Sequence, residues 1–170
     1  MTLASPLKTV MGDTGDIIRK HVGQGGSTTL VRANGSDLFL GAVVTFSGET
    51  VNDPDVDLCA KGEQPDGIII GPAYSAVDLD KDSDDCYDDN TWLTMYTPLP
   101  GEEIYLTVKT NTSISYGARV QVDGGFLIPW AYTNATEVTD VLESVIGKSM
   151  TAVTAVASTE AIALIRWATA

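Results

Sequence analysis

The chain has 170 residues with a hydrophobic content of 44%, enough for one domain with a core and a short arm. No run approaches the ~18 apolar residues that a membrane helix needs, and the first residues, MTLASPLKTVMGD, lack the apolar segment of a signal peptide, so we expect neither membrane insertion nor the usual route of secretion. The net charge of −13 comes from one segment, because residues 49–103 hold 15 of the 23 acidic residues and two bases. An acidic surface repels phosphate, which argues against direct nucleic-acid binding.

The N-terminal segment, residues 1–27, shows little of the alternation that follows. It contains Pro6, several glycines and the bases Lys8, Arg19 and Lys20. This composition predicts an extended arm that becomes ordered on a partner surface, with a disordered tail as the alternative.

Short apolar runs separated by turn residues then follow one another. Asn34-Gly35 and Gly71-Pro72 are turn signals, and residues 73–91 read as an acidic loop. The runs are rich in β-branched and aromatic residues, which predicts strands. These strands are expected at Thr29–Arg32, Leu38–Phe46, Val56–Ala60, Ile68–Ile70 and Trp92–Tyr96.

The stretch from Pro98 to Trp130 has the clearest strand pattern. Ile104, Leu106 and Val108 alternate with polar residues, as in a strand with one buried face. Asp123-Gly124-Gly125 predicts a tight turn with positive φ. The runs around it predict the two strands of a hairpin, Val120–Val122 and Phe126–Trp130.

The C-terminal part completes an all-β chain. Residues 133–145 are the one place where helical spacing suggests a short helix, and Met150–Val156 and Ala161–Trp167 read as a closing pair of strands. Nine or ten short strands with at most one short helix predict a small β-barrel or sandwich over residues 28–170. The sequence contains no exact internal repeat.

The acidic loop is the sharpest local candidate for a metal site. Asp78, Asp80, Asp82 and Asp89 fall at four ligand positions of an EF-hand-like loop. Ser83 stands where the turn requires glycine, and Asp89 is shorter than the usual bidentate Glu. These departures favour a solvated acidic loop with no cofactor, and Ca²⁺ binding is the alternative. Asp53, Asp55 and Asp57 form a second alternating trio of acids, for which a solvated loop is again favoured over a metal site.

Two cysteines, Cys59 and Cys86, are too few for a disulfide framework, and their spacing does not suggest zinc. Two thiols are the favoured interpretation, because the cytoplasm is reducing. The alternative, a Cys59–Cys86 disulfide, would close a loop of about 28 residues and stabilise the fold by ~3 kcal/mol.

Motifs for catalysis are lacking. His21 is the only histidine, and nothing in the sequence places a nucleophile beside it. The glycine-rich run Gly23–Gly26 is not followed by the Lys-Ser/Thr of a phosphate-binding loop. We therefore expect a protein that is not an enzyme.

Five segments in order carry a family resemblance: GAVVTFSG, QPDGIIIGPA, GEEIYLTVKT, SYGARVQVDGGFLIP and VIGKSMTAVTAVASTEAIALIRW. Over residues 37–167 their order resembles the capsid decoration proteins of tailed bacteriophages, also called head-stabilising or cement proteins. The acidic residues 73–91 have no counterpart in that pattern.

The resemblance implies a β-tulip-like barrel that binds the outer surface of a phage head as a homotrimer, at three-fold and quasi-three-fold positions, with the major capsid protein as partner. It implies no enzymatic activity. Residues 1–27 would be the arm that reaches over the capsid protein, and its expected contact residues are Leu7, Lys8, Ile17, Ile18, Arg19 and Lys20. The alternative function is a β-barrel receptor- or carbohydrate-binding virion module, either with or without a requirement for Ca²⁺.

Overall fold

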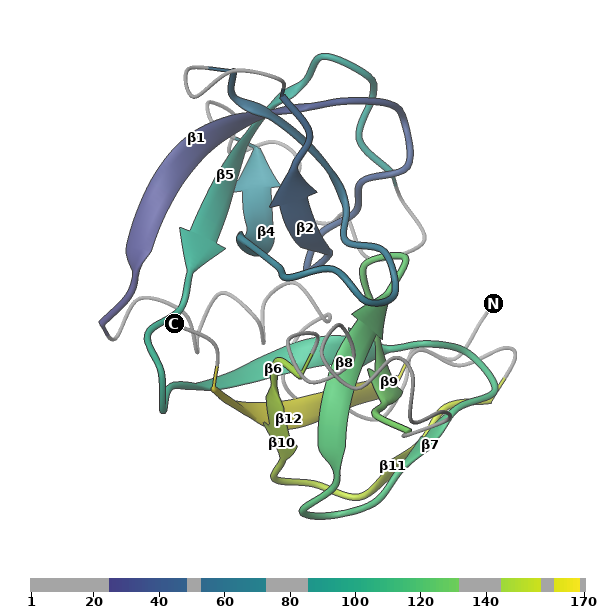
Figure 1. Cartoon of the computed structure of the whole chain (residues 1–170). Helices are drawn as coiled ribbons and strands as arrows, with labels where there is room; N and C mark the ends of the chain where they lie inside the picture. Colours follow the sequence, from purple (N-terminus) through teal and green to yellow (C-terminus); the bar gives the residue numbers. More distant parts are fainter. Residues whose placement is uncertain (1–24, 49–52, 73–85, 132–144, 157–160, 169–170) are drawn as a thin grey trace.

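A computed structural model describes residues 25–48, 53–72, 86–131, 145–156 and 161–168. Over these residues the chain is all β and contains no helix, which confirms the predicted fold class. The segment 133–145, expected to hold a helix, lies almost entirely outside them. The strands form two closed barrels, one above the other in Figure 1, and a separate two-stranded sheet.

The N-terminal barrel closes in the order β1-β3-β2-β4-β5. β1 pairs with β3 in parallel, and the other four ladders are antiparallel. Its interior contains alternate residues of the strands, for example Val31, Val44 and Met95. Its strands are β1 (Ser27–Ala33), β2 (Val43–Phe46), β3 (Asp55–Leu58), β4 (Gly67–Pro72) and β5 (Trp92–Thr97).

The C-terminal barrel closes in the order β10-β12-β6-β9-β8. The two short strands β7 and β11 pair beside it. Its strands are β6 (Glu103–Val108), β8 (Arg119–Asp123), β9 (Phe126–Pro129), β10 (Gly147–Ser149) and β12 (Ala161–Trp167), with β7 (Ser113–Ile114) and β11 (Val153–Thr154) in the small sheet.

Most predicted strands exist, but the closing pair predicted for Met150–Val156 and Ala161–Trp167 is wrong, because β11 pairs with β7 and β12 pairs with β6 and β10. Other differences concern where strands begin and which short strands form. The predicted strand Leu38–Phe46 begins only at Val43, because Gly41 has a φ of 86° and turns the chain there. The short strands β7 and β10 were not predicted, since two or three residues are too few to show alternation. The described strands also form two barrels, where the sequence suggested one.

The two barrels have the same topology. β1 to β5 correspond in order to β6, β8, β9, β10 and β12, and each ladder of one barrel has a counterpart of the same direction in the other. The registers also correspond. Val44 lies opposite Gly67, and their counterparts Val120 and Gly147 lie opposite each other. We therefore regard the fold as a tandem duplication of one five-stranded barrel.

A shared turn identifies the duplication in the sequence. Gly41-Ala42 precedes β2 and Gly117-Ala118 precedes β8, and both glycines have positive φ, 86° and 76°. The N–H of Gly41 donates to the carbonyl of Ile69 at 2.8 Å, and the N–H of Gly117 donates to the carbonyl of Ser149 at the same distance. Only glycine adopts this conformation without strain.

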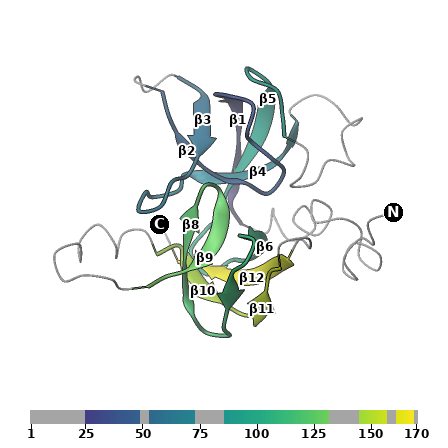
Figure 2. The ribbon, with the colours of Figure 1, turned by 90° about the vertical axis from the view of Figure 1, so that its right-hand side faces the viewer.

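The β8–β9 turn joins the two barrels, and it reaches from the lower barrel to the upper one in Figures 1 and 2. Gly125 donates its N–H to the carbonyl of Cys59 and accepts a hydrogen bond from the N–H of Val43, each at 3.1 Å. It thus lies between two neighbouring strand ends of the N-terminal barrel. Next to it, the ring of Phe126 stacks on Phe39 with centroids 4.4 Å apart.

Side chains fill the junction around this turn. Val43, Cys59, Ile68 and Tyr96 belong to the same buried cluster as the interior of the C-terminal barrel. The outer face of β2, β4 and β5 is therefore covered by the second barrel. Removing this apolar area from water favours the stacked arrangement.

A polar contact supports the connection between the barrels. The hydroxyl of Tyr96 donates to the carboxylate of Glu102, 2.6 and 2.8 Å from its two oxygens, and accepts a hydrogen bond from the N–H of Gly26. The backbone of Glu102 accepts from the N–H of Trp167 at 2.7 Å. The linker between the barrels, residues 98–102, is thus hydrogen-bonded to the last strand of each barrel.

The two cysteines are thiols, and no disulfide joins them. Cys59 is buried at the junction and Cys86 is exposed. Burial, with the nearby charges of Glu63 and Asp66, raises the pKa of the Cys59 thiol to about 12. Cys59 is therefore protonated and unreactive at neutral pH.

A pair of glycine variants tests the junction. Both Gly124 and Gly125 have positive φ, but an added Cβ at Gly124 meets no atom within 4 Å, whereas one at Gly125 lies 2.7 Å from Leu58 Cδ2. Gly124→Ala should lower the free energy of unfolding by about 1 kcal/mol through backbone strain. Gly125→Ala should cost a further ~1–3 kcal/mol through overpacking. If urea denaturation shows the same loss of unfolding free energy for both variants, the close contact between Gly125 and Leu58 is contradicted.

Thiol titration tests the burial of Cys59. In the native protein at pH 8, we expect one thiol to react quickly with an aromatic disulfide reagent and the second only after denaturation. Cys86→Ser should remove the fast reaction, and Cys59→Ser should leave it. Two fast thiols in the native protein would mean that the junction is open.

Candidate functional site

Most residues predicted to act in binding lie outside the described residues. This holds for the arm residues Leu7, Lys8, Ile17, Ile18, Arg19 and Lys20 and for the three loop aspartates Asp78, Asp80 and Asp82. Their roles stay predictions.

Asp89, the fourth candidate metal ligand, takes part in a turn. Its Oδ1 accepts a hydrogen bond from the N–H of Gly35 at 2.8 Å, and its Oδ2 accepts from the side-chain amide of Asn90 at 2.7 Å. Its own N–H donates to the hydroxyl of Ser36. Asp89 thus connects the start of β5 to the turn after β1.

The trio Asp53, Asp55 and Asp57 makes local contacts around Arg32. The guanidinium of Arg32 donates to both carboxylate oxygens of Asp55, at 2.5 and 2.8 Å. These hydrogen bonds lower the pKa of Asp55 and raise that of Arg32. Asp57 accepts from the side-chain amide of Asn34. The trio therefore supports the parallel β1–β3 ladder.

Within the described ranges, no group of three or more His, Cys, Asp or Glu side chains lies close enough together to hold a metal ion. In the same residues, no helix is long and apolar enough to cross a membrane.

The duplication reveals a contrast between the outer faces of the barrels. In the N-terminal barrel this face presents Val43, Ile68 and Tyr96, which are fully buried against the second barrel. The register correspondence gives their counterparts in the C-terminal barrel. These are the exposed bases Arg119, Lys148 and Arg166, and we call the outer surface of β8, β10 and β12 that they occupy the basic face.

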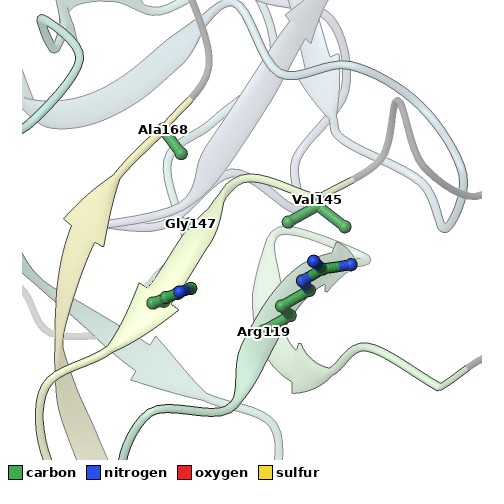
Figure 3. A pocket seen from close by; sticks show the side chains of 5 residues that line it. Arg119, Val145, Gly147 and Ala168 are labelled. Atoms are coloured by element: carbon green, nitrogen blue, oxygen red, sulfur yellow. The ribbon is translucent and has the colours of Figure 1, made fainter.

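A shallow pocket of about 350 Å³ lies on the basic face. Figure 3 shows Arg119 on β8, Val145 before β10 and Ala168 after β12 at its edge. Gly147 and Lys148 complete the lining. By register, Arg119 and Lys148 correspond to the junction residues Val43 and Ile68 of the first barrel, so the pocket lies where the first barrel receives the second.

Neighbouring groups hold two of the bases in place. The guanidinium of Arg119 lies 5.5 Å from the ring centroid of Trp130, a cation–π contact. Arg166 donates to the carboxylate of Glu103 at 2.8 Å, although its side chain is 54% exposed. This exposed ion pair contributes little to stability and orients the guanidinium along the face.

The described part of the N-terminal barrel has the opposite charge. Between residues 27 and 97 it has two bases, Arg32 and Lys61. Against these stand eight acids: Asp37, Asp53, Asp55, Asp57, Glu63, Asp66, Asp88 and Asp89. The described residues therefore form an acidic barrel and a barrel with a basic face.

Sequence reasoning missed the basic face. Arg119, Lys148 and Arg166 are up to 47 positions apart and lie on three different strands. The available signal was the pair Gly41-Ala42-x-Val44 and Gly117-Ala118-x-Val120, which aligns Arg119 with Val43.

Comparison with known proteins gives one finding on the fold. No family model matches the chain, and no curated protein sequence matches it. Among solved structures, the N base of the head fibre protein gp8.5 of bacteriophage phi29 is similar, with a TM-score of 0.50 and 12% sequence identity. The similarity covers 86% of this chain and 99% of that one. At 12% sequence identity, this similarity shows a shared fold alone.

Proposed function

We propose that this chain is a structural virion protein without enzymatic activity, which binds the outer surface of a phage head as a trimer at three-fold and quasi-three-fold positions and stabilises the expanded shell. The observation that carries the proposal is the fold similarity to a head fibre base over 99% of its length. The order of five sequence segments, which resembles capsid decoration proteins, supports it independently.

The charge distribution is consistent with this role. An acidic, water-facing barrel keeps decorated particles from adhering to one another. The basic N-terminal residues Lys8, Arg19 and Lys20 would bind the major capsid protein, as an arm that becomes ordered on contact. Three arms in one trimer make weak individual contacts persistent.

Truncation tests the proposal. Strand β1 begins at Ser27, and the N–H of Gly26 donates to Tyr96, so a variant that lacks residues 1–24 keeps the barrel contacts. Light scattering should give a trimer for the full chain. The full chain should co-sediment with expanded heads, and the truncated chain should bind at least tenfold more weakly. A strict monomer that leaves heads unbound at high concentration would exclude the proposal.

A calcium titration separates the alternative, a Ca²⁺-dependent receptor- or carbohydrate-binding module. We expect no heat of Ca²⁺ binding and no change in melting temperature with EDTA. Saturable binding that Asp78→Asn/Asp80→Asn/Asp82→Asn removes would favour the alternative. The same substitutions should leave head binding unchanged if the acidic loop is only solvated.

A further inference from the structure

We propose that the basic face binds an acidic patch on the major capsid protein, with Arg119 and Lys148 as the residues that meet its carboxylates. The inference rests on the proposed function and deepens it, because it assigns a second contact with the head, besides the N-terminal arm, to the described part of the chain.

The bases of this face stand in one row across three strands. Arg119 lies directly opposite Lys148, and Lys148 lies directly opposite Arg166. Arg166 in turn lies opposite Glu103, with which it forms an ion pair. Side chains that are directly opposite in antiparallel strands share a face and lie close together. Four neighbouring positions thus carry three positive charges and one negative charge.

Two of these bases have charges that nothing in the described ranges neutralises. Of the six bases in those ranges, Arg32, Lys109 and Arg166 pair with carboxylates. Among the same residues, Arg119 and Lys148 have no carboxylate partner, and both are exposed. Like charges in direct opposition destabilise a sheet. A carboxylate placed between the two side chains removes this repulsion and accepts hydrogen bonds from both.

The pocket beside the two bases has room for side chains of a partner. Its volume is about 350 Å³, and Val145, Gly147 and Ala168 line it together with the bases. The ring of Trp130, 5.5 Å from the guanidinium of Arg119, limits the motion of that group before binding. Less rotamer entropy is then lost on binding. A guanidinium held in this way can bind a carboxylate through two parallel hydrogen bonds.

The acidic N-terminal barrel favours a protein over a nucleic acid as the partner. A DNA duplex carries one charge per about 1.7 Å of its axis. Its phosphates would extend past the row of bases, and the eight acids of the described N-terminal barrel would repel them. An acidic patch on a folded protein is confined to a few side chains and can meet the basic face alone. Carboxylates of a protein are therefore the occupant that fits the charge distribution.

Charge reversal at Lys148 tests the contact. Lys148→Glu places an acid between Arg119 and Arg166, so the melting temperature should stay the same or rise. Co-sedimentation of the full chain with expanded heads should nevertheless weaken by about tenfold or more, because a repulsive charge replaces an attractive one. Lys148→Gln should weaken it to a smaller extent, and Lys148→Arg should preserve it. Lys61→Glu, the same charge reversal at an exposed position of the N-terminal barrel, is the matched control and should bind as the wild type does.

Three further measurements identify the partner. Added NaCl should weaken head binding of the wild type more steeply than that of Lys148→Glu, since salt screens the charge that the variant has lost. Light scattering should give the same mass for both proteins. Labelled duplex DNA should not bind the wild-type chain at physiological salt.

The outcomes separate this inference from the proposed function. If Lys148→Glu binds heads as the wild type does, or if Lys61→Glu weakens binding equally, the contact is overturned and the proposed function stands. Loss of trimer mass in Lys148→Glu also overturns the contact, since the face would then hold copies together. Saturable DNA binding that Lys148→Glu removes would overturn it in favour of a phosphate partner. A wild-type chain that leaves heads unbound contradicts the proposed function and, with it, the contact.

Discussion

The stacking of the two barrels depends on one contact, in which the β8–β9 turn enters the end of the N-terminal barrel. Gly125 enters the end of the N-terminal barrel and bonds to the N–H of Val43 and the carbonyl of Cys59. Buried backbone groups need hydrogen-bond partners, so a strand end without this insertion would have to bind water or open. The stacked rings of Phe39 and Phe126 and the buried Cys59 follow from the same approach. Two small barrels, each with a limited core, are stabilised as one body by sharing this contact.

The duplicated barrel explains why similar frameworks have different outer faces. Most interior positions stay apolar in both halves, as with Val44 and Val120, because each barrel must fill its own core. The outer positions are constrained only by what covers them. Ile68 is covered by the second barrel, whereas its counterpart Lys148 is exposed. At these outer positions, apolar residues therefore mark a face that is covered within the chain, and charged residues mark one that is exposed.

Sequence patterns predicted the all-β class, most strands and the positive φ of Gly124 and Gly125, because these depend on local periodicity and turn chemistry. They did not predict two barrels. Closure depends on ladders between distant strands, such as Ala33 with Val56 in parallel, and no local signal encodes that register. The basic face was missed for the same reason. The roles predicted for the arm and for Asp78, Asp80 and Asp82 concern residues beyond those described.

The charged outer face of the second barrel avoids an exposed apolar patch. An apolar copy of the junction face, with Val, Ile and Tyr in place of Arg119, Lys148 and Arg166, would expose a patch of the kind that causes indiscriminate association. Three bases replace that attraction with one selective for an acidic partner, and like faces repel each other. Two basic faces therefore cannot pair symmetrically, which disfavours a two-fold dimer.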